Sequence, residues 1–311
     1  MAEFETVTDG LGFPEGPVAL PDGSVIVVET FAGKITRVRP DGTKQVVAEP
    51  GGGPNGLAFG PDGRLYCVNN GGYQSWTDPR GREFTHGVRP DFAGGWVERI
   101  DIDSGKVEVL YRSGDFGHAL RGPNDIVFDA NGGFWFTDHG KLDYQRRCHD
   151  IVGIFYARTD GSLLDEVIFP SRNPNGIGLS PDGTRLYAAE TYTTSLVEFT
   201  VTGPGQVADD DAGPRPGRVI NRPGGRGYFD SLAVEANGNI CVATPGSAGG
   251  ISVISPAGEL IEFVECDDPI VTNICFGGPD MRDAWLTFSG SGRLVKTRWP
   301  RPGLRLNFQL A

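Results

Sequence analysis

One pattern recurs along the chain and restricts the possible folds more than any other feature of the sequence. Each copy has a polar residue, a small residue, an apolar run, a turn dipeptide and a second run in which apolar residues alternate. The clear copies are PEGPVALPDGSVIVVET from Pro14, PNGLAFGPDGRLYCVNN from Pro54, PNDIVFDANGGFWFTDH from Pro123, PNGIGLSPDGTRLYAAET from Pro174 and FDSLAVEANGNICVATP from Phe229. A weaker copy, VTNICFGGPDMRDAWLTF, begins at Val271. Internal repetition of this kind indicates a fold built from similar units.

The turn in each clear copy lies at a constant distance from the leading polar residue. Asp22 follows Glu15 by seven residues, and the same spacing relates Asn55 to Asp62, Asn124 to Asn131, Asn175 to Asp182 and Asp230 to Asn237. Asp-Gly and Asn-Gly between alternating apolar runs are strong hairpin signals, because these residues tolerate positive φ. A third strand follows in most copies, such as KITRVRP after Gly33. The pattern therefore predicts six units of three or four antiparallel strands.

The repeat length favours one all-β architecture. The leading polar positions are 15, 55, 124, 175, 230 and 272, so successive copies lie 40 to 69 residues apart. Four-stranded repeats of about 40–50 residues are typical of propeller blades. We therefore expect residues 1–311 to form a single six-bladed β-propeller, with a large β-sandwich as the alternative. A strand near Phe4–Val7 is expected to complete the last blade and remove a free sheet edge.

In a propeller the first strand of each blade lines the central channel, so equivalent residues form a ring around the axis. The predicted ring consists of Glu15, Asn55, Asn124, Asn175, Asp230 and Thr272. All six side chains offer oxygen atoms, but two carboxylates in a narrow channel repel each other and lose hydration. A divalent cation removes both problems, and such ligands suit Ca²⁺, Mg²⁺ or Mn²⁺. The alternative is that Asn55-Gly56 and Asn175-Gly176 are simply hairpin turns.

Two further features are expected at the mouth of this channel. The returning strands of the hairpins end on a second set of polar residues, which are Glu29, Asn69, Asp138, Glu190 and Thr244. The longest insertion, Asn70–Gly95, is rich in aromatic residues, including Tyr73, Trp76 and Phe92. We expect this insertion to be a loop that acts as a lid or a specificity wall.

Composition argues against several classes of function. The chain has 28 Lys and Arg against 40 Asp and Glu, a net charge of −12, and an acidic surface repels nucleic acid. No stretch approaches the ~18 apolar residues of a membrane helix, and the N-terminus lacks a signal-peptide pattern. The five cysteines have no CxxC spacing, so a reduced, cytoplasmic protein is expected. The sequence carries no signal for an oligomeric state.

Four segments together resemble the SMP-30/gluconolactonase/LRE family over nearly the whole chain. They are FPEGP at Phe13–Pro17, GPNDIVFDANGGFWFTD at Gly122–Asp138, NPNGIGLSPDGTRLYAAET at Asn173–Thr191 and FDSLAV at Phe229–Val234. The resemblance implies a six-bladed propeller with one catalytic divalent metal in the channel. It implies that Glu15, Asn175 and Asp230 are metal ligands, and that Asn124 completes the ligand set or contacts the substrate. It also implies that Asp230 is the general base.

Three further residues are candidates for substrate contact. In the animal members of the family an arginine two residues before the PND-type asparagine grips the sugar; here Arg121 lies three residues before Asn124. Asp138 and His139 follow the third hairpin at the predicted channel mouth.

These observations predict a divalent-metal-dependent carboxylic ester hydrolase that opens a small-molecule lactone, with a sugar lactone as the family's usual substrate. Ca²⁺ is the expected metal, and Zn²⁺, Mn²⁺, Mg²⁺ and Fe²⁺ also fit such ligands. GxSxG, P-loop and HExxH motifs do not occur. The alternatives are an esterase or phosphotriesterase that uses the same metal, and a propeller that binds a partner without catalysis.

Overall fold

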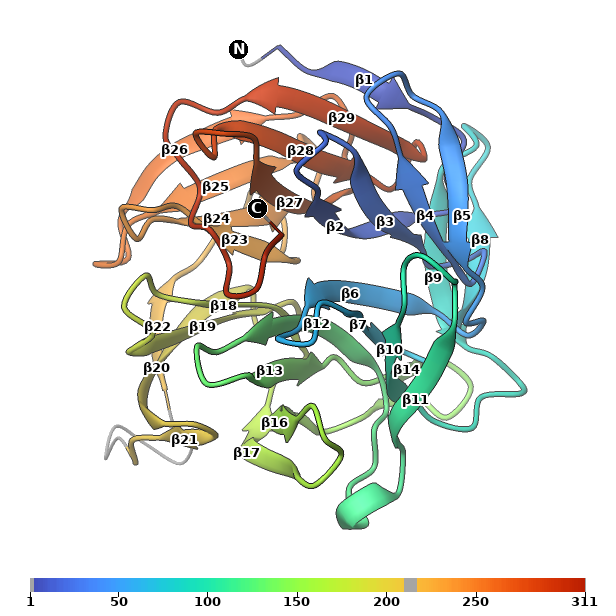
Figure 1. Ribbon diagram of the computed structural model, residues 1–311, viewed down its shortest axis with the longest axis vertical. Helices are drawn as coiled ribbons and strands as arrows, with labels where there is room; N and C mark the ends of the chain where they lie inside the picture. Colours follow the sequence, from blue (N-terminus) through green and yellow to red (C-terminus); the bar gives the residue numbers. More distant parts are fainter. Residues whose placement is uncertain (1–2, 210–216, 311) are drawn as a thin grey trace.

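The computed structural model describes residues 3–209 and 217–310, and its main sheets form six antiparallel blades around a central axis (Figure 1). The first three blades, from the innermost strand outward, are β2 (Pro14–Ala19), β3 (Val25–Glu29), β4 (Lys34–Val38) and β5 (Lys44–Ala48); β6 (Pro54–Phe59), β7 (Leu65–Asn69), β10 (Trp96–Ile100) and β11 (Val107–Arg112); and β12 (Pro123–Phe128), β13 (Gly133–Asp138), β16 (Val152–Arg158) and β17 (Leu164–Ser171).

The other three blades follow the same order. They are β18 (Pro174–Leu179), β19 (Arg185–Glu190) and β20 (Ser195–Gly203), with β21 (Gln206–Val207) and β22 (Arg218–Asn221) both paired to β20; β23 (Leu232–Val234), β24 (Ile240–Thr244), β25 (Gly250–Ile254) and β26 (Leu260–Glu265); and β27 (Val271–Gly277), β28 (Asp283–Phe288), β29 (Arg293–Arg298) and β1 (Glu5–Thr8). The prediction of an all-β, six-bladed propeller is confirmed.

Turn chemistry explains why each repeat forms a hairpin. In the first blade Asp22 Oδ1 accepts the N–H of Ser24 at 3.1 Å, and Gly23 takes a φ of 81°. The same side-chain turn recurs at Asp62 with Arg64, Asp182 with Thr184 and Asn237 with Asn239. The glycine that follows each of these turn residues also has positive φ. Local sequence therefore sets the position of the hairpins, as the Asp-Gly and Asn-Gly dipeptides predict.

A strand from the N-terminus closes the ring of blades. Strand β1 pairs antiparallel with β29, and Glu5 lies opposite Lys296. The last blade therefore combines three strands from the end of the chain with one from its beginning, as predicted. This pairing covers an edge that would otherwise expose unpaired backbone groups.

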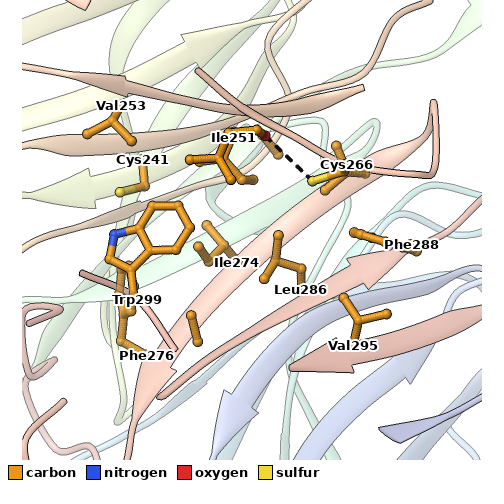
Figure 2. Packing of buried hydrophobic residues seen from close by; sticks show 14 of the residues in the cluster. Cys241, Ile251, Val253, Cys266, Ile274, Phe276, Leu286, Phe288, Val295 and Trp299 are labelled. Carbon is orange, nitrogen blue, oxygen red and sulfur yellow. Dashed lines mark hydrogen bonds between the residues drawn. The ribbon is translucent and has the colours of Figure 1, made fainter. Parts of the chain in front are cut away.

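Apolar side chains fill the spaces between neighbouring blades. Figure 2 shows one such cluster, in which Cys241 and Ile251 of the fifth blade pack with Ile274 and Leu286 of the sixth. Trp299, which follows β29, is 1% exposed and belongs to the same cluster. Burial of this apolar surface holds adjacent blades together.

The six innermost strands contact one another around the axis, and the chain covers one end of the channel that they form. The C-terminal segment crosses this end, near the centre of Figure 1. Leu304 N–H bonds to Val234 O at 2.8 Å, Asn307 Nδ2 to Phe128 O at 3.0 Å, and Gln309 Nε2 to Phe276 O at 2.9 Å. These acceptors belong to the fifth, third and sixth blades, so the segment ties three blades together at the ends of their innermost strands.

The insertion between β7 and β10 contains a hairpin, where the sequence predicts a loop. Its strands are β8 (Tyr73–Thr77) and β9 (Glu83–Val88). Arg82 closes the turn by pairing with Asp78 at 2.6 Å, and Trp76 packs against Phe84 across the pair with ring centroids 5.5 Å apart. A second hairpin, β14 (Leu142–Asp143) with β15 (Cys148–His149), lies beside it.

Helical structure is limited in the described chain. Asp115–Gly117 forms a single 3₁₀ turn. Across residues 3–209 and 217–310 there is no helix with the length and apolar character of a transmembrane segment.

Candidate metal and substrate site

A cavity of about 450 Å³ opens at the end of the channel opposite the C-terminal segment. The six residues of the predicted ring all line it; they are Glu15, Asn55, Asn124, Asn175, Asp230 and Thr272. Five of them are the second residue of an innermost strand, and Asp230 lies two residues before β23, so the ring draws on six different blades. The structure thus brings together side chains that are as far apart in sequence as positions 15 and 272.

The backbone bulges where it presents the ring. In five of the six blades the register between the first two strands shifts at the ring residue, as between Glu15 and Val18 in the first blade. A bulge re-aims one side chain relative to its neighbours. The repeated irregularity therefore turns five of the ring side chains toward the axis while the rest of each strand keeps its pairing.

Close approach of neighbouring innermost strands explains the small residue that follows most ring members. A Cβ on Gly56 would lie 2.7 Å from Asp125 Cα, and one on Gly176 would lie 2.6 Å from Leu232 N. A Cβ on Gly16 would collide with the backbone oxygen of Asn55. Glycine at these positions lets the strands converge, and the convergence makes the ring narrow.

Glu15 is buried and held in a fixed position. Its Oε2 accepts the N–H of Gly16 at 2.9 Å and Nδ2 of Asn273 at 3.1 Å. Burial raises the pKa of the Glu15 carboxyl above its ordinary value, although these hydrogen bonds oppose the rise. A buried carboxyl of this kind is stabilised by a positive partner.

Asp230 precedes β23 and is held by the backbone of the same blade. Its N–H bonds to Ala243 O at 2.9 Å. Burial raises the pKa of Asp230 well above its ordinary value, and the negative charge of Glu15 raises it further. The charges of Glu15 and Asp230 therefore act on each other across the ring, as the prediction of a shared axial site requires.

Asn175 and Asn124 place amide oxygens in the same cavity. Asn175 Oδ1 accepts from Ser231 Oγ at 3.3 Å, and its Nδ2 faces Thr191 Oγ1 at 3.4 Å. Asn124 Oδ1 is buried and finds no hydrogen-bond donor in the part of the chain that the structure describes. A buried acceptor without a donor is unusual, and it suits a ligand that supplies positive charge.

The donor set fits a hard divalent cation. Glu15 and Asp230 supply carboxylates, Asn124 and Asn175 supply amide oxygens, and all four side chains line one cavity. Oxygen ligands of this mixed type are those that Ca²⁺ and Mg²⁺ prefer. Residues 3–209 and 217–310 contain no cluster of three or more His, Cys, Asp or Glu side chains placed to hold a metal. The candidate set here has only two carboxylates, and its other two members are amides.

A third carboxyl lies directly beside the ring. Asp125 Oδ1 accepts the N–H of Ile126 at 2.9 Å, and its Oδ2 accepts the N–H of Ile177 at 3.2 Å. Burial, and then the charge of Glu15, raise the pKa of Asp125 to about 7. This residue links the innermost strands of the third and fourth blades, and it places a third acidic group beside the candidate metal ligands.

Thr272 and Asn55 complete the ring in different ways. The Thr272 hydroxyl lies 2.9 Å from Thr287 Oγ1 and also bonds to Ser289 Oγ, so it is already satisfied within its own blade. Asn55 is buried and lines the cavity.

The alternative that Asn55-Gly56 and Asn175-Gly176 are hairpin turns is wrong, because the first pair lies within strand β6 and the second within strand β18.

The second polar set does not reach the cavity. Glu29 pairs with Pro14 rather than with Glu15, and Asp138 pairs with Pro123. Successive side chains of a strand point to opposite faces, so a one-residue offset turns this set away from the axis. Four of its five members instead accept backbone N–H groups of loops; examples are Glu29 with Gly12 and Glu190 with Arg172. The Thr244 hydroxyl bonds within its own blade, to Val242 O and Ser252 Oγ.

The three predicted substrate contacts are placed differently. His139 lines the cavity, and its Nδ1 is buried without a partner among the described residues. Asp138 is not in the lining; its carboxylate accepts the N–H groups of Arg121, Gly122 and Gly140 at 2.6–2.8 Å. We therefore correct the prediction that Asp138 contacts the substrate: its carboxylate holds the adjoining loops instead.

Arg121 also lies outside the cavity lining. Its Nε bonds to Asp150 Oδ2 at 3.0 Å, and its guanidinium lies 4.8 Å from the centre of the Phe92 ring. Its side chain thus connects the third blade to the insertion. The geometry gives no support to the predicted grip on a sugar.

Several cavity residues escape sequence analysis because they lie between the repeats or at their ends. They are Phe13, Leu142, Tyr144, Thr191, Tyr192, Tyr228 and Ile270. Three of them could have been found from their position in the sequence, because Phe13, Tyr228 and Ile270 each lie two residues before a ring member. The insertion contributes Tyr73, Thr85 and Gly87, which agrees with its predicted place as a wall.

The fold and the site define a propeller whose innermost strands present an oxygen-rich ring at one end of the axis. The family model for the SMP-30/Gluconolactonase/LRE-like region matches residues 13–290. The chain belongs to this family.

Named relatives cover most of the chain at low identity. A gluconolactonase of Zymomonas mobilis is 24% identical over 95% of this chain and 81% of its own length. A diisopropyl-fluorophosphatase of Loligo vulgaris is 26% identical over 96% of this chain and 93% of its own. The solved structure of regucalcin, a calcium-binding protein of Agrobacterium tumefaciens, aligns with a TM-score of 0.71 at 18% identity and covers 98% of both chains.

Proposed function

We propose that this protein is a divalent-metal-dependent hydrolase that opens a lactone ring. The main observation behind this proposal is the buried ring, in which Glu15 and Asp230 line one cavity together with Asn124 and Asn175. Family membership and the Zymomonas mobilis gluconolactonase support a lactone as substrate. The expectation of a sugar lactone rests on such relatives alone.

We assign Glu15, Asn175 and Asp230 as metal ligands, with Asn124 completing the set. Ca²⁺ is the first candidate, supported by the oxygen donors and by the calcium-binding regucalcin; Mg²⁺, Mn²⁺, Zn²⁺ and Fe²⁺ are alternatives. When bound, the cation supplies Lewis-acid polarisation of the lactone carbonyl and neutralises the charge of the two carboxylates.

The chain's own residues then bind and orient the reactants. Asn124 orients the lactone, because an amide both donates and accepts hydrogen bonds. Asp230 accepts a proton from the water molecule that adds to the carbonyl carbon. The bond between that carbon and the ring oxygen breaks, Asp230 returns the proton to the ring oxygen, and the product is a hydroxy acid.

His139 offers a neutral hydrogen-bonding group in the same cavity. Burial, and secondarily the charge of Lys141, lower the pKa of His139 to about 4, so the imidazole is uncharged at pH 7. Its Nδ1 lacks a partner among the residues described and is available to the substrate.

The test is Asp230→Ala and Glu15→Gln, compared with the exposed control Glu259→Gln. Each site variant is expected to lose bound metal and about 100-fold or more of its lactonase activity, whereas the control keeps both. Metal content is measured on the purified proteins, and hydrolysis is measured with and without chelator. Full activity together with full metal occupancy in Asp230→Ala would refute the proposal.

A phosphotriesterase is the second candidate, because the Loligo vulgaris relative is a diisopropyl-fluorophosphatase. The same metal ligands could polarise a phosphoryl oxygen. A parallel assay with lactones and a paraoxon-like triester separates the two activities. Metal binding without turnover of either class would instead indicate a propeller that only binds its partner.

A further inference from the structure

The cavity above the ring has an aromatic rim. Its members are Phe13, Tyr73, Tyr144, Tyr192 and Tyr228, and they come from separate loops and hairpins. Tyr144 is 58% exposed, Tyr192 50% and Tyr228 39%. Large aromatic side chains gathered at a cavity mouth and left open to solvent mark a surface that recognises an apolar group.

Two hairpins build one side of this rim as a single wall. The ring of His86 in β9 stacks on Tyr144 beside β14, with centroids 5.5 Å apart. Gly87 leaves room for this contact, since a Cβ there would lie 3.1 Å from the Tyr144 ring. The insertion and the second hairpin therefore support each other, and Tyr144 is positioned before any substrate arrives.

Contacts with Lys141 and Gly140 hold the Tyr73 side chain in place. The Lys141 ammonium lies 3.3 Å from the centre of the Tyr73 ring, and Tyr73 Oη reaches Gly140 O at 3.4 Å. Lys141 Nζ also bonds to Asn70 Oδ1 at 3.2 Å and to Gly72 O at 3.0 Å. The hydroxyl and one face of the ring are thus engaged by protein, so Tyr73 presents the cavity with aromatic surface.

The lining has no cation for an anionic substituent. Among the described residues that line the cavity there is no Lys or Arg. The nearby cations are committed elsewhere, Arg121 to Asp150 and Lys141 to the insertion. An anionic substituent would therefore lose hydration in the cavity without gaining a cationic partner.

Two of the hydroxyl groups that line the cavity are already bonded to the protein. The Thr191 hydroxyl is committed to Phe229 O at 3.0 Å, and the Tyr73 hydroxyl is engaged by Gly140. Sugar hydroxyls pressed against aromatic faces would lose hydration without regaining hydrogen bonds. An uncharged apolar group loses nothing of this kind on entering.

We propose that the preferred substrates are lactones whose ring carries an uncharged aromatic or other apolar substituent, seated on the rim of Phe13, Tyr73, Tyr144, Tyr192 and Tyr228. This inference rests on the proposed lactonase function and specifies its substrate class. The ester group lies over the ring of metal ligands, and the substituent packs between the tyrosines.

The experiment compares four probes with the metal-loaded protein: δ-valerolactone, its δ-phenyl derivative, the δ-(4-carboxyphenyl) derivative and glucono-δ-lactone. The phenyl lactone is expected to have a kcat/KM about 10-fold or more above that of δ-valerolactone, from burial of its ring. The carboxylate and the sugar lactone are expected to fall below the phenyl lactone by a similar factor.

Variants Tyr144→Ala and Tyr192→Ala assign the preference to the rim. Each is expected to reduce the ratio of kcat/KM for the phenyl lactone to that for δ-valerolactone by about 5-fold. Both side chains are half exposed or more, so melting temperature should stay unchanged and report intact folding. The control Trp76→Ala removes an exposed aromatic side chain of the Asn70–Gly95 insertion that does not line the cavity, and should leave the ratio as it is.

The outcomes distinguish failure of the proposed substrate class from failure of the proposed lactonase function. Hydrolysis of δ-valerolactone without a preference for the phenyl lactone, or a preference for glucono-δ-lactone, overturns the substrate class and leaves the lactonase standing. A phenyl preference that survives both tyrosine variants overturns the role of the rim. Hydrolysis of none of the four probes overturns the lactonase and the substrate class together.

Discussion

Gly176 shows how a single residue determines the geometry of the ring. It follows Asn175 in β18, and the neighbouring innermost strand comes so close that a Cβ would lie 2.6–2.7 Å from the backbone of Ser231 and Leu232. Its φ is not positive, so the requirement for glycine is one of space. The same reason holds at Gly56, where the close neighbour is Asp125.

Gly176→Ala is therefore expected to destabilise the fold by about 1–3 kcal/mol and to displace Asn175 from the candidate metal site. Urea unfolding measures the loss of stability, and metal titration measures the effect on metal binding. The matched control is Gly203→Ala, where the added Cβ would meet only the Gln206 side chain at 3.4 Å. Equal stability of the two variants would contradict the close-approach argument.

Glu98 is a buried carboxyl outside the candidate site. It accepts Nδ2 of Asn69 at 3.1 Å and Nε1 of Trp96 at 2.7 Å. Burial raises the pKa of Glu98 to about 7, while these hydrogen bonds oppose the rise. Since the folded-state pKa lies above the ordinary value of 4.5, folding favours the protonated form. The stability it contributes is complete below about pH 4.5 and is lost as pH rises through about 7.

Glu98→Gln is expected to flatten the pH dependence of stability. In the wild type the free energy of unfolding should fall between pH 5 and pH 8, with up to about 3 kcal/mol of that fall due to Glu98. Urea unfolding at both pH values measures the difference. The variant should lose this share of the fall, and the exposed control Glu259→Gln should not. An unchanged slope in Glu98→Gln would assign the pH dependence to other groups.

At the scale of elements, the insertion depends on one buried lysine. Lys141 follows β13, yet its ammonium bonds to Asn70 and Gly72 and lies 5.1 Å from the centre of the Phe92 ring. Burial lowers the pKa of Lys141 well below its ordinary value, although Asp138 opposes the fall. The third blade thus holds both ends of the insertion, and with them the Tyr73 side of the cavity.

Lys141→Ala is expected to loosen the insertion without unfolding the blades. The substitution removes the lysine donor from Gly72 O and from Asn70 Oδ1, which keeps only the N–H of Gly72; a buried acceptor left without a donor costs about 1–3 kcal/mol. Hydrogen exchange should therefore speed up by about 10-fold or more in β8 and β9, with unchanged rates in β24 and β28. The exposed control Lys106→Ala should alter neither region. Uniform acceleration across all blades would show that Lys141 supports the whole fold instead.

At the scale of the whole molecule, both ends of the chain complete the propeller. Strand β1 supplies the outer strand of the last blade, and Thr297 Oγ1 bonds to Glu3 O at 2.8 Å. The C-terminal segment covers the far end of the channel, where Phe308 meets Phe128 with ring centroids 5.9 Å apart. As a result, the described cavity that contains the ring residues opens on one side of the molecule.

Deletion of residues 1–8 is expected to lower the melting temperature by about 5–10 °C. The deletion uncovers β29 and exposes its backbone groups, which also favours aggregation. Differential scanning calorimetry and light scattering report the two effects. Glu5→Gln, which keeps the strand and changes only an exposed side chain, is the control. A melting temperature equal to that of the full chain would show that β1 contributes little to closure.

Local rules explain how much of this architecture could be predicted from the sequence. The Asp-Gly turn at Asp22 and the alternation in Val25–Glu29 depend on neighbours in sequence, so six repeats imply six blades. Equivalent positions of the repeats then place Glu15, Asn124, Asn175 and Asp230 around one axis. Their meeting in one cavity was foreseeable for this reason, whereas their part in metal binding stays a prediction.

The orientation of the other candidate side chains depended on contacts between segments that are distant in the sequence. A bulge at Glu15 shifts the pairing by one residue, so Glu29 and Asp138 turn from the channel toward the loops. Arg121 is committed to Asp150, and the rim joins Tyr73 to Tyr144 and Tyr192 across three blades. The sequence alone determined the repeated hairpins and their ring of oxygen atoms, because turns and alternation are local. Only the tertiary structure decided which side chains face the substrate, because packing between blades selects among faces that the pattern leaves equivalent.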